Sequence, residues 1–117
     1  MMVEEPRARN QALFRDVNER IQDVATDFRV TDEASFVCEC ADIGCTQMVS
    51  LTLTEYEHVR INPRRFAVLP DHVDPAIERL VEQNDRYVVV EKIGAAAKVT
   101  ERLDPRVAER LDSRDPE

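Results

Sequence analysis

The sequence predicts a single α+β domain: an N-terminal amphipathic helix, a cysteine-bearing β-hairpin and short helices packed on a small, mostly antiparallel sheet. Three observations lead to this prediction. Apolar residues recur every three or four positions near the N-terminus, short alternating segments hold the three cysteines, and three successive valines follow a tyrosine in the second half. The 117 residues suit one hydrophobic core. No internal repeat or long linker suggests a second domain.

The expected domain spans residues 9–104. Residues 1–8 are expected to form a flexible N-terminus, and residues 105–117 an acidic, frayed tail. Aromatic residues make up only 5% of the chain, so the core is expected to be lean. A bound metal would stabilise such a core, because affinity for the folded state adds directly to the free energy of folding.

Residues 9–28 have the spacing of one amphipathic helix. The apolar positions of its stripe are Leu13, Phe14, Val17, Ile21, Val24, Ala25 and Phe28. Charged residues of both signs occupy the other side, as is typical of a solvated surface. We interpret the stripe as the side that faces the core. The alternative is a seam for a homodimer or for a docked protein partner.

The three cysteines lie within eight residues of one another, on the expected hairpin. Alternation over residues 35–40 places Cys38 and Cys40 on one side of a strand and Glu39 on the other. A turn that contains a glycine follows and returns Cys45 to the first two sulfurs. The hairpin is therefore expected to form a small knuckle with three convergent thiols.

The middle of the chain alternates short strands and helices. Residues 47–53 are expected to form the returning strand of the hairpin. Thr54 and Glu57 have the spacing of a capping box, which predicts a short helix that begins at Thr54. Asn62 and the proline after it end that helix, and residues 65–69 are expected to be extended.

Three further elements complete the expected fold. Asp74 followed by proline is a helix-start signal, and the apolar side of that helix would hold Ile77, Leu80 and Val81. Residues 87–92 are the strongest strand of the chain and are expected to lie at the centre of the sheet. Gly94 ends this strand, and residues 95–103 are expected to form a last short helix.

Charge and hydropathy bear on several functional classes. Sixteen basic and twenty-four acidic residues give a net charge of −8, which disfavours general nucleic-acid binding. No apolar run approaches the roughly 18–20 residues needed to cross a bilayer. The first residues lack the pattern of a secretory leader, so we expect a cytoplasmic protein with reduced thiols.

The cysteines, together with a histidine, predict a zinc site. Thiolate and imidazole are the ligands of closed tetrahedral zinc sites, and Cys38, Cys40 and Cys45 supply three of them. Two histidines compete for the fourth position. His58 fits an exposed residue of the predicted capped helix. His72 follows a strand, where the chain can return past the hairpin, and we favour it.

Four protein ligands leave no open position for a water molecule, so the expected role of the zinc is structural and the protein is not expected to be an enzyme. The expected function is that of a small cytoplasmic zinc-binding protein, regulatory, that acts through contacts with a protein partner. Three alternatives stay open: a thiol-based redox or metal sensor that uses the same cysteines, cysteines that bind no metal, and an enzyme with an open zinc site if His72 does not ligate.

A second candidate site is basic. Arg60, Arg64 and Arg65 cluster around a proline in an otherwise acidic chain. They are interpreted either as ordinary solvated surface or as a docking site for an acidic partner or a phosphate.

A set of residues that covers most of the chain forms a wider pattern. Its members are Asn18-Glu19-Arg20-Ile21, Phe36-Val37-Cys38-Glu39-Cys40, Cys45, Leu51-Thr52, Glu55-Tyr56, Val59-Arg60, Pro63, Arg65-Phe66, Pro70, His72, Tyr87-Val88-Val89-Val90-Glu91-Lys92 and Asp104-Pro105-Arg106. This pattern resembles a family of small uncharacterised bacterial proteins with a Cys-Glu-Cys motif. The resemblance implies the same four ligands and no established activity. One departure is Asp71, where the family has glycine before the histidine; this carboxylate could alter the loop or bond to the imidazole.

Overall fold

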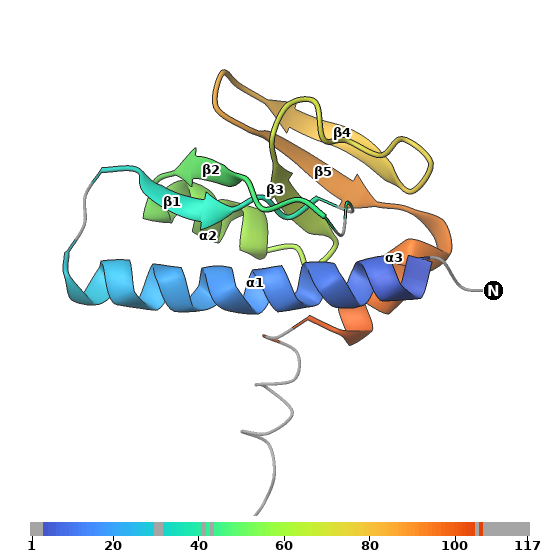
Figure 1. Ribbon diagram of the computed structural model, residues 1–117, viewed down its shortest axis with the longest axis horizontal. Coiled ribbons are helices and arrows are strands. Elements are labelled where there is room, and N and C mark those ends of the chain that lie inside the picture. Colours follow the sequence, from blue (N-terminus) through green and yellow to red (C-terminus); the bar gives the residue numbers. More distant parts are fainter. Residues whose placement is uncertain (1–3, 30–31, 41, 43, 105, 107–117) are drawn as a thin grey trace, which may run out of the picture.

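The computed structural model describes residues 4–29, 32–40, 42, 44–104 and 106. Within these ranges the fold is α+β, as predicted. In chain order the elements are α1 (Glu4–Asp27), β1 (Ala34–Val37), β2 (Met48–Leu51), α2 (Leu53–Arg60), β3 (Arg65–Val68), β4 (Glu78–Gln83), β5 (Val88–Lys92) and α3 (Gly94–Arg102). Figure 1 shows α1 along one side of the molecule, with both sheets on the same side of it and α3 beside its N-terminal half. No helix in the described ranges combines the length and the apolar character needed to cross a bilayer.

The predicted N-terminal helix is confirmed, but it starts earlier and packs with a different side. α1 begins at Glu4, so residues 4–8, which were assigned to a flexible N-terminus, belong to the helix. The side chains that α1 buries are Gln11, Arg15, Asn18 and Ala25, whereas Leu13, Val17, Val24 and Phe28 are exposed. The interpretation of the apolar stripe as the core-facing side is therefore wrong for these four exposed residues.

The polar side of α1 is buried because its side chains find hydrogen-bond partners in other elements. Asn18 Nδ2 donates to the Val37 carbonyl at 2.9 Å, and Asn18 Oδ1 accepts from the Val37 amide at 2.7 Å. Arg15 Nη1 donates to the Pro63 carbonyl at 2.8 Å. Burial of polar groups is tolerated when such bonds replace those to water. None of these partners is close to α1 in sequence, so helical periodicity alone could not reveal this face.

The hairpin forms as predicted, with shorter strands. β1 pairs antiparallel with β2, and Phe36 lies opposite Val49. The ring of Phe36 is fully buried and stacks on Tyr56 of α2, with 4.4 Å between ring centroids. This stacked pair belongs to the main core cluster, which fixes the hairpin to α2. Because β1 ends at Val37, Cys38 and Cys40 follow the strand and do not belong to it.

The second sheet has the strand order β3-β5-β4, with all pairs antiparallel. β5 lies at its centre, as the run of valines predicted, and Val88, Val89 and Val90 are all buried. A central strand that is buried on both faces needs hydrophobic residues at every position, which explains the continuous run. β3 corresponds to the extended segment predicted at residues 65–69.

The helix predicted after Asp74 is wrong, because β4 occupies most of that segment. Asp74 does cap a turn: its Oδ1 accepts from the Ala76 amide at 3.1 Å, and its carbonyl accepts from the Glu78 amide at 2.9 Å. The chain then becomes extended and pairs with the second edge of β5, whose buried amides and carbonyls require partners. A buried ion pair between Glu78 and Lys92 of β5, at 2.5 Å, joins the two strands.

α2 confirms the predicted short helix, but its cap lies two residues earlier than the predicted one. Thr52 is the N-cap: its Oγ1 accepts from the Glu55 amide at 3.1 Å, and Glu55 Oε1 accepts from the Thr52 amide at 2.8 Å. Glu55 also bonds to Arg86 near the start of β5. Glu57, the acceptor in the predicted box, bonds instead to Arg106.

Replacement of the N-cap should be measurable in stability. We expect Thr52→Ala to lower the free energy of unfolding by about 1 kcal/mol, since it removes the hydroxyl that caps the first turn. Thr54→Ala is the matched control, because Thr54 is exposed, and its effect should stay within about 0.5 kcal/mol. Urea unfolding of both variants checks the prediction. A larger loss at Thr54 than at Thr52 would contradict the observed cap.

The end of the chain is described only in part. α3 confirms the helix predicted over residues 95–103, and it begins at Gly94, whose φ of +62° suits glycine. Asp104 follows and is buried. Of the predicted frayed tail, only Arg106 lies within the described residues. It bonds to Glu19 of α1 and Glu57 of α2 and so ties this point of the chain to the domain.

Candidate metal centre

Three separate segments of the chain bring the four predicted ligands together. Cys38 and Cys40 follow β1, Cys45 follows the next turn, and His72 lies in the loop after β3. The Cys38 amide donates to the carbonyl of Gln47 at 2.9 Å, and this bond joins the two sides of the knuckle. The site is therefore built where the hairpin passes the end of the second sheet.

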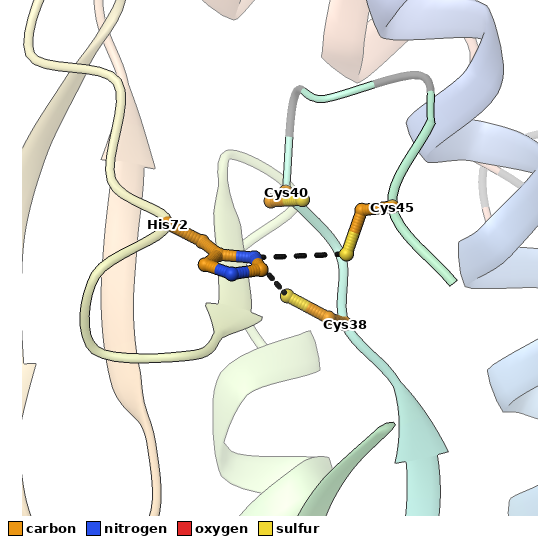
Figure 2. Close-up of side chains that lie close together, drawn as sticks. All are labelled: Cys38, Cys40, Cys45 and His72. Carbon is orange, nitrogen blue, oxygen red and sulfur yellow. Dashed lines mark hydrogen bonds between the residues drawn. The ribbon is translucent and has the colours of Figure 1, made fainter. Parts of the chain in front are cut away.

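The ligand atoms of these four residues converge. His72 Nδ1 lies 3.5 Å from Cys38 Sγ and 3.6 Å from Cys45 Sγ (Figure 2). The three sulfurs and one ring nitrogen of the group all lie within 4.8 Å of one another. All three cysteines are free thiols. Three sulfurs and a nitrogen at such separations can hold one metal ion.

The turn of the knuckle and the loop of His72 are each fixed by local hydrogen bonds. Asp42 Oδ1 accepts from the Gly44 amide at 2.9 Å, and the Asp42 carbonyl accepts from the Cys45 amide at 3.1 Å. The His72 amide donates to the Leu69 carbonyl at 3.0 Å, and the Leu69 amide donates to Cys38 Sγ at 3.3 Å. These hydrogen bonds help to hold the three segments in place.

The orientation of the imidazole is also determined. Nδ1 faces the sulfurs, while Nε2 lies 3.7 Å from the carboxylate of the adjacent Asp71. A carboxylate beside the non-ligating nitrogen commonly orients a metal-binding histidine and raises its basicity. Asp71 thus lies near the imidazole, but 3.7 Å is too long for the hydrogen bond that the sequence suggested.

The site is buried in an apolar surrounding. The side chains that pack with the three cysteines are Phe66, Val68, Leu69, Val73, Val88 and Val90. Cys38 and Cys40 have no exposed area, while the side chain of His72 retains 19% exposure. Among these four side chains, His72 is the most exposed to solvent.

The three thiols differ in acidity. The hydrogen bond with Cys38 lowers the pKa of Cys40 to about 5, against the raising effect of burial. The same hydrogen bond raises the pKa of Cys38 well above its usual range, and burial raises the pKa of Cys45. The lowered pKa of Cys40 favours its thiolate, which is the form of cysteine that binds metals.

The competing histidine lies elsewhere. The side chain of His58 on α2 is 60% exposed, and its Nε2 lies 3.0 Å from Glu82 Oε2 on β4. It is not a member of the cysteine group. The geometry thus brings His72 to the cysteines and leaves His58 at the surface.

The three arginines proposed as a basic patch do not form one free surface. Arg60 is buried and bonds to both carboxylate oxygens of Asp104, at 3.0 and 2.7 Å, and to Glu19 at 2.5 Å. Burial alone would raise the pKa of Asp104, but the hydrogen bonds from Arg60 outweigh it and lower that pKa. Arg60 is thus a structural cation, closed to an external ligand.

The other two arginines also pair within the chain. Arg64 Nε lies 3.0 Å from Glu101 of α3, and Arg65 Nε lies 3.0 Å from Glu91 of β5. Since their charges are matched by nearby carboxylates, the structure offers no support for a partner or anion site at these positions.

Sequence reasoning missed the role of Glu39. The predicted alternation does turn it away from the sulfurs, but the opposite side is interior and not solvent. Its Oε2 accepts from Asn18 Nδ2 at 2.9 Å and from the Tyr56 hydroxyl at 2.8 Å. Its Oε1 accepts from the Ala67 amide at 3.2 Å and lies 3.8 Å from Arg15 Nε. One carboxylate thus joins α1, α2 and β3.

This arrangement explains why a glutamate stands between two ligands. Glu39 also donates its amide to the Ala67 carbonyl at 3.0 Å, so its backbone and its side chain both hold the segment. The neighbouring Cys38 and Cys40 are thereby held at fixed positions. The only signal in the sequence was an acidic residue flanked by apolar and sulfur-bearing neighbours.

Comparisons of the chain with protein-family models, curated proteins and solved structures find no match. The resemblance to the Cys-Glu-Cys family therefore stays a prediction. The geometry of the four side chains is what carries the functional argument.

Proposed function

We propose that Cys38, Cys40, Cys45 and His72 bind one Zn²⁺ ion. A tetrahedral zinc ion, with Zn–S of about 2.3 Å and Zn–N of about 2.0–2.1 Å, separates nitrogen and sulfur by about 3.5 Å. The distances from His72 Nδ1 to Cys38 Sγ and Cys45 Sγ, 3.5 and 3.6 Å, match this separation. This match is the single observation that carries the proposal. The family resemblance implies the same ligand set.

Three features favour a structural role for the ion. Four protein ligands close the tetrahedron and leave no position for a reacting water. Glu39, which stands between two of the ligands in sequence, is occupied by hydrogen bonds on the other side of the segment, so it does not serve as a general base. The ion would join the knuckle after β1 to the loop after β3. Its affinity for this arrangement adds to folding stability.

The proposed function is therefore that of a small zinc-stabilised binding protein with a regulatory role, which acts through protein contacts and performs no reaction at the metal. The ion would fix the end of the hairpin against the second sheet. The surfaces of the domain, including the exposed face of α1, would then be available to a partner.

A second candidate uses the same side chains. A thiol-based redox or metal sensor needs clustered, reduced thiols of low pKa, and the hydrogen bond with Cys38 lowers the pKa of Cys40. The burial of Cys38 and Cys40 speaks against this candidate, because an oxidant must reach the sulfur. The structural role is the better supported of the two.

A matched pair of histidine variants tests the zinc site. We expect His72→Ala to weaken zinc binding by more than about 10-fold, since loss of a group that merely contacts a ligand already costs about 10–100-fold. His58→Ala should bind zinc as the wild type does, because that side chain lies outside the cluster. Competition with a chromogenic chelator measures both affinities. Equal zinc affinity in the two variants would exclude His72 as a ligand.

A further inference from the structure

α1 and Phe28, the turn residue directly after it, carry an apolar surface that nothing in the described part of the chain covers. Its members are Leu13, Val17, Val24 and Phe28, with exposed fractions of 58, 37, 55 and 79%. We call these four residues the apolar arc. On a helix of 3.6 residues per turn they fall on one side, within about 60° of one another. Exposed apolar side chains that form one continuous strip mark an interaction surface more often than isolated ones do.

The apolar arc is separate from the side of α1 that packs on the domain. The buried residues Gln11, Arg15, Asn18 and Ala25 are centred about 125° around the helix axis from the centre of the arc. β1, α2 and α3 contact α1. A partner could therefore lie along the arc without displacing any of these elements.

Arg106, the last residue that the structure describes, lies on another side of α1. Arg106 bonds to Glu19 and Gln22, which are each about 150° around the axis from the centre of the arc. The last eleven residues follow from that point. The occupant of the arc is therefore argued from the spacing of the arc itself and not from the position of these residues.

The spacing of the arc identifies its occupant. Its four positions are symmetric about the midpoint between Arg20 and Ile21, so the pattern is the same in both chain directions. We infer that α1 pairs antiparallel with α1 of a second copy, about a two-fold axis at this midpoint. Leu13 of each copy then meets Phe28 of the other, and Val17 meets Val24. Two-fold interfaces require such self-complementary surfaces.

Charge and length set the expected strength of this contact. Each copy has a net charge of −8, so two copies repel one another and the apolar arc must supply the attraction. The strip from Leu13 to Phe28 is about 22 Å long and only one helix wide, so the area that it buries should fall below the roughly 800 Å² per partner of a standard interface. We therefore expect a weak dimer that dissociates in the micromolar range. Higher salt should strengthen it, because screening weakens the repulsion of like charges.

Sedimentation equilibrium of the full-length, zinc-loaded protein tests the inference. At about 100 µM the wild type should have twice the chain mass, and dissociation should appear near 1 µM. Val17→Lys and Val24→Glu should each weaken the dimer by more than about 10-fold, since each places an unpaired charge in the seam. Ile61→Glu is the control, because Ile61 is 72% exposed and lies outside α1. Unchanged zinc content in every variant separates this result from loss of the metal site.

The double variant Val17→Lys/Val24→Glu tests the two-fold arrangement itself. In the proposed register each new lysine meets the glutamate of the other copy, so the dimer should regain at least about 10-fold in affinity over either single variant. A wild type that stays monomeric at 100 µM, or a dimer that both single variants leave intact, would overturn the inference. A double variant as weak as the single ones would overturn the antiparallel register.

Discussion

Replacement of Cys40 by alanine is expected to abolish zinc binding and to lower the melting temperature of the protein by more than about 10 °C. The sulfur of Cys40 is fully buried in the ligand cluster, so no water molecule can take its place as a ligand. Structural zinc contributes about 10–16 kcal/mol of apparent binding free energy in small domains. Loss of about a third of this binding free energy would lower the free energy of unfolding by about 3 kcal/mol. In a domain of about this size, 1 kcal/mol corresponds to about 4–8 °C in melting temperature.

The chelator-treated wild type separates the metal effect from the effect of a smaller side chain. Both proteins lack zinc under chelation, so the variant should then differ from the wild type only by the lost packing of one sulfur, which is about 1 kcal/mol. Thermal melting with and without chelator, together with elemental analysis, makes this comparison. A melting curve of Cys40→Ala that coincides with that of the zinc-loaded wild type would contradict a stabilising ion at these cysteines.

The sequence allowed the ligand set to be predicted because it depends on residue type and on short-range order. Three cysteines within eight residues come close together in space once a hairpin forms. His72 was chosen by its place after a strand, and that criterion sufficed because β3 is the strand that holds the segment of Glu39. The valines of β5 were equally clear, since only a central buried strand needs such a run.

The errors come from contacts between residues distant in sequence. The segment just before β4 has a valid helix-start signal at Asp74. The open edge of β5, however, offers more hydrogen bonds to an extended chain than a short isolated helix retains. α1 presents its polar side to the core because partners such as Pro63 and Val37 lie there. Periodicity predicts that a helix has two faces, and only the rest of the fold determines which one is buried.

The arginines illustrate the same limit. Arg60 has neighbours that suggest a basic surface, yet it is buried against Asp104, which lies 44 residues further along the chain. The sequence shows which charges lie near Arg60 along the chain. Whether Arg60 is buried depends on where the fold places its partner, Asp104. The role of Glu39 was missed for the same reason.

Removal of the Glu39 carboxylate is the second change for which we expect a large effect. Glu39→Ala leaves the Asn18 amide, the Tyr56 hydroxyl and the Ala67 amide without their shared acceptor. It also leaves the buried guanidinium of Arg15 with less compensation, because the Glu39 carboxylate raises the Arg15 pKa that burial lowers. Truncation of one member of a buried charged pair costs about 3–5 kcal/mol. We expect the free energy of unfolding to fall by that amount.

The consequence for the metal centre should be separable from the loss of stability. Since Glu39 holds the segment that carries Cys38 and Cys40, Glu39→Ala should weaken zinc binding although the glutamate is not a ligand. Urea unfolding and chelator competition measure the two effects. Glu82→Ala is the matched control, because the side chain of Glu82 is 43% exposed and pairs only with His58 among the contacts observed here, so its cost should stay below about 1 kcal/mol. A loss below about 1 kcal/mol at Glu39, equal to that of the control, would mean that this carboxylate does not anchor the knuckle.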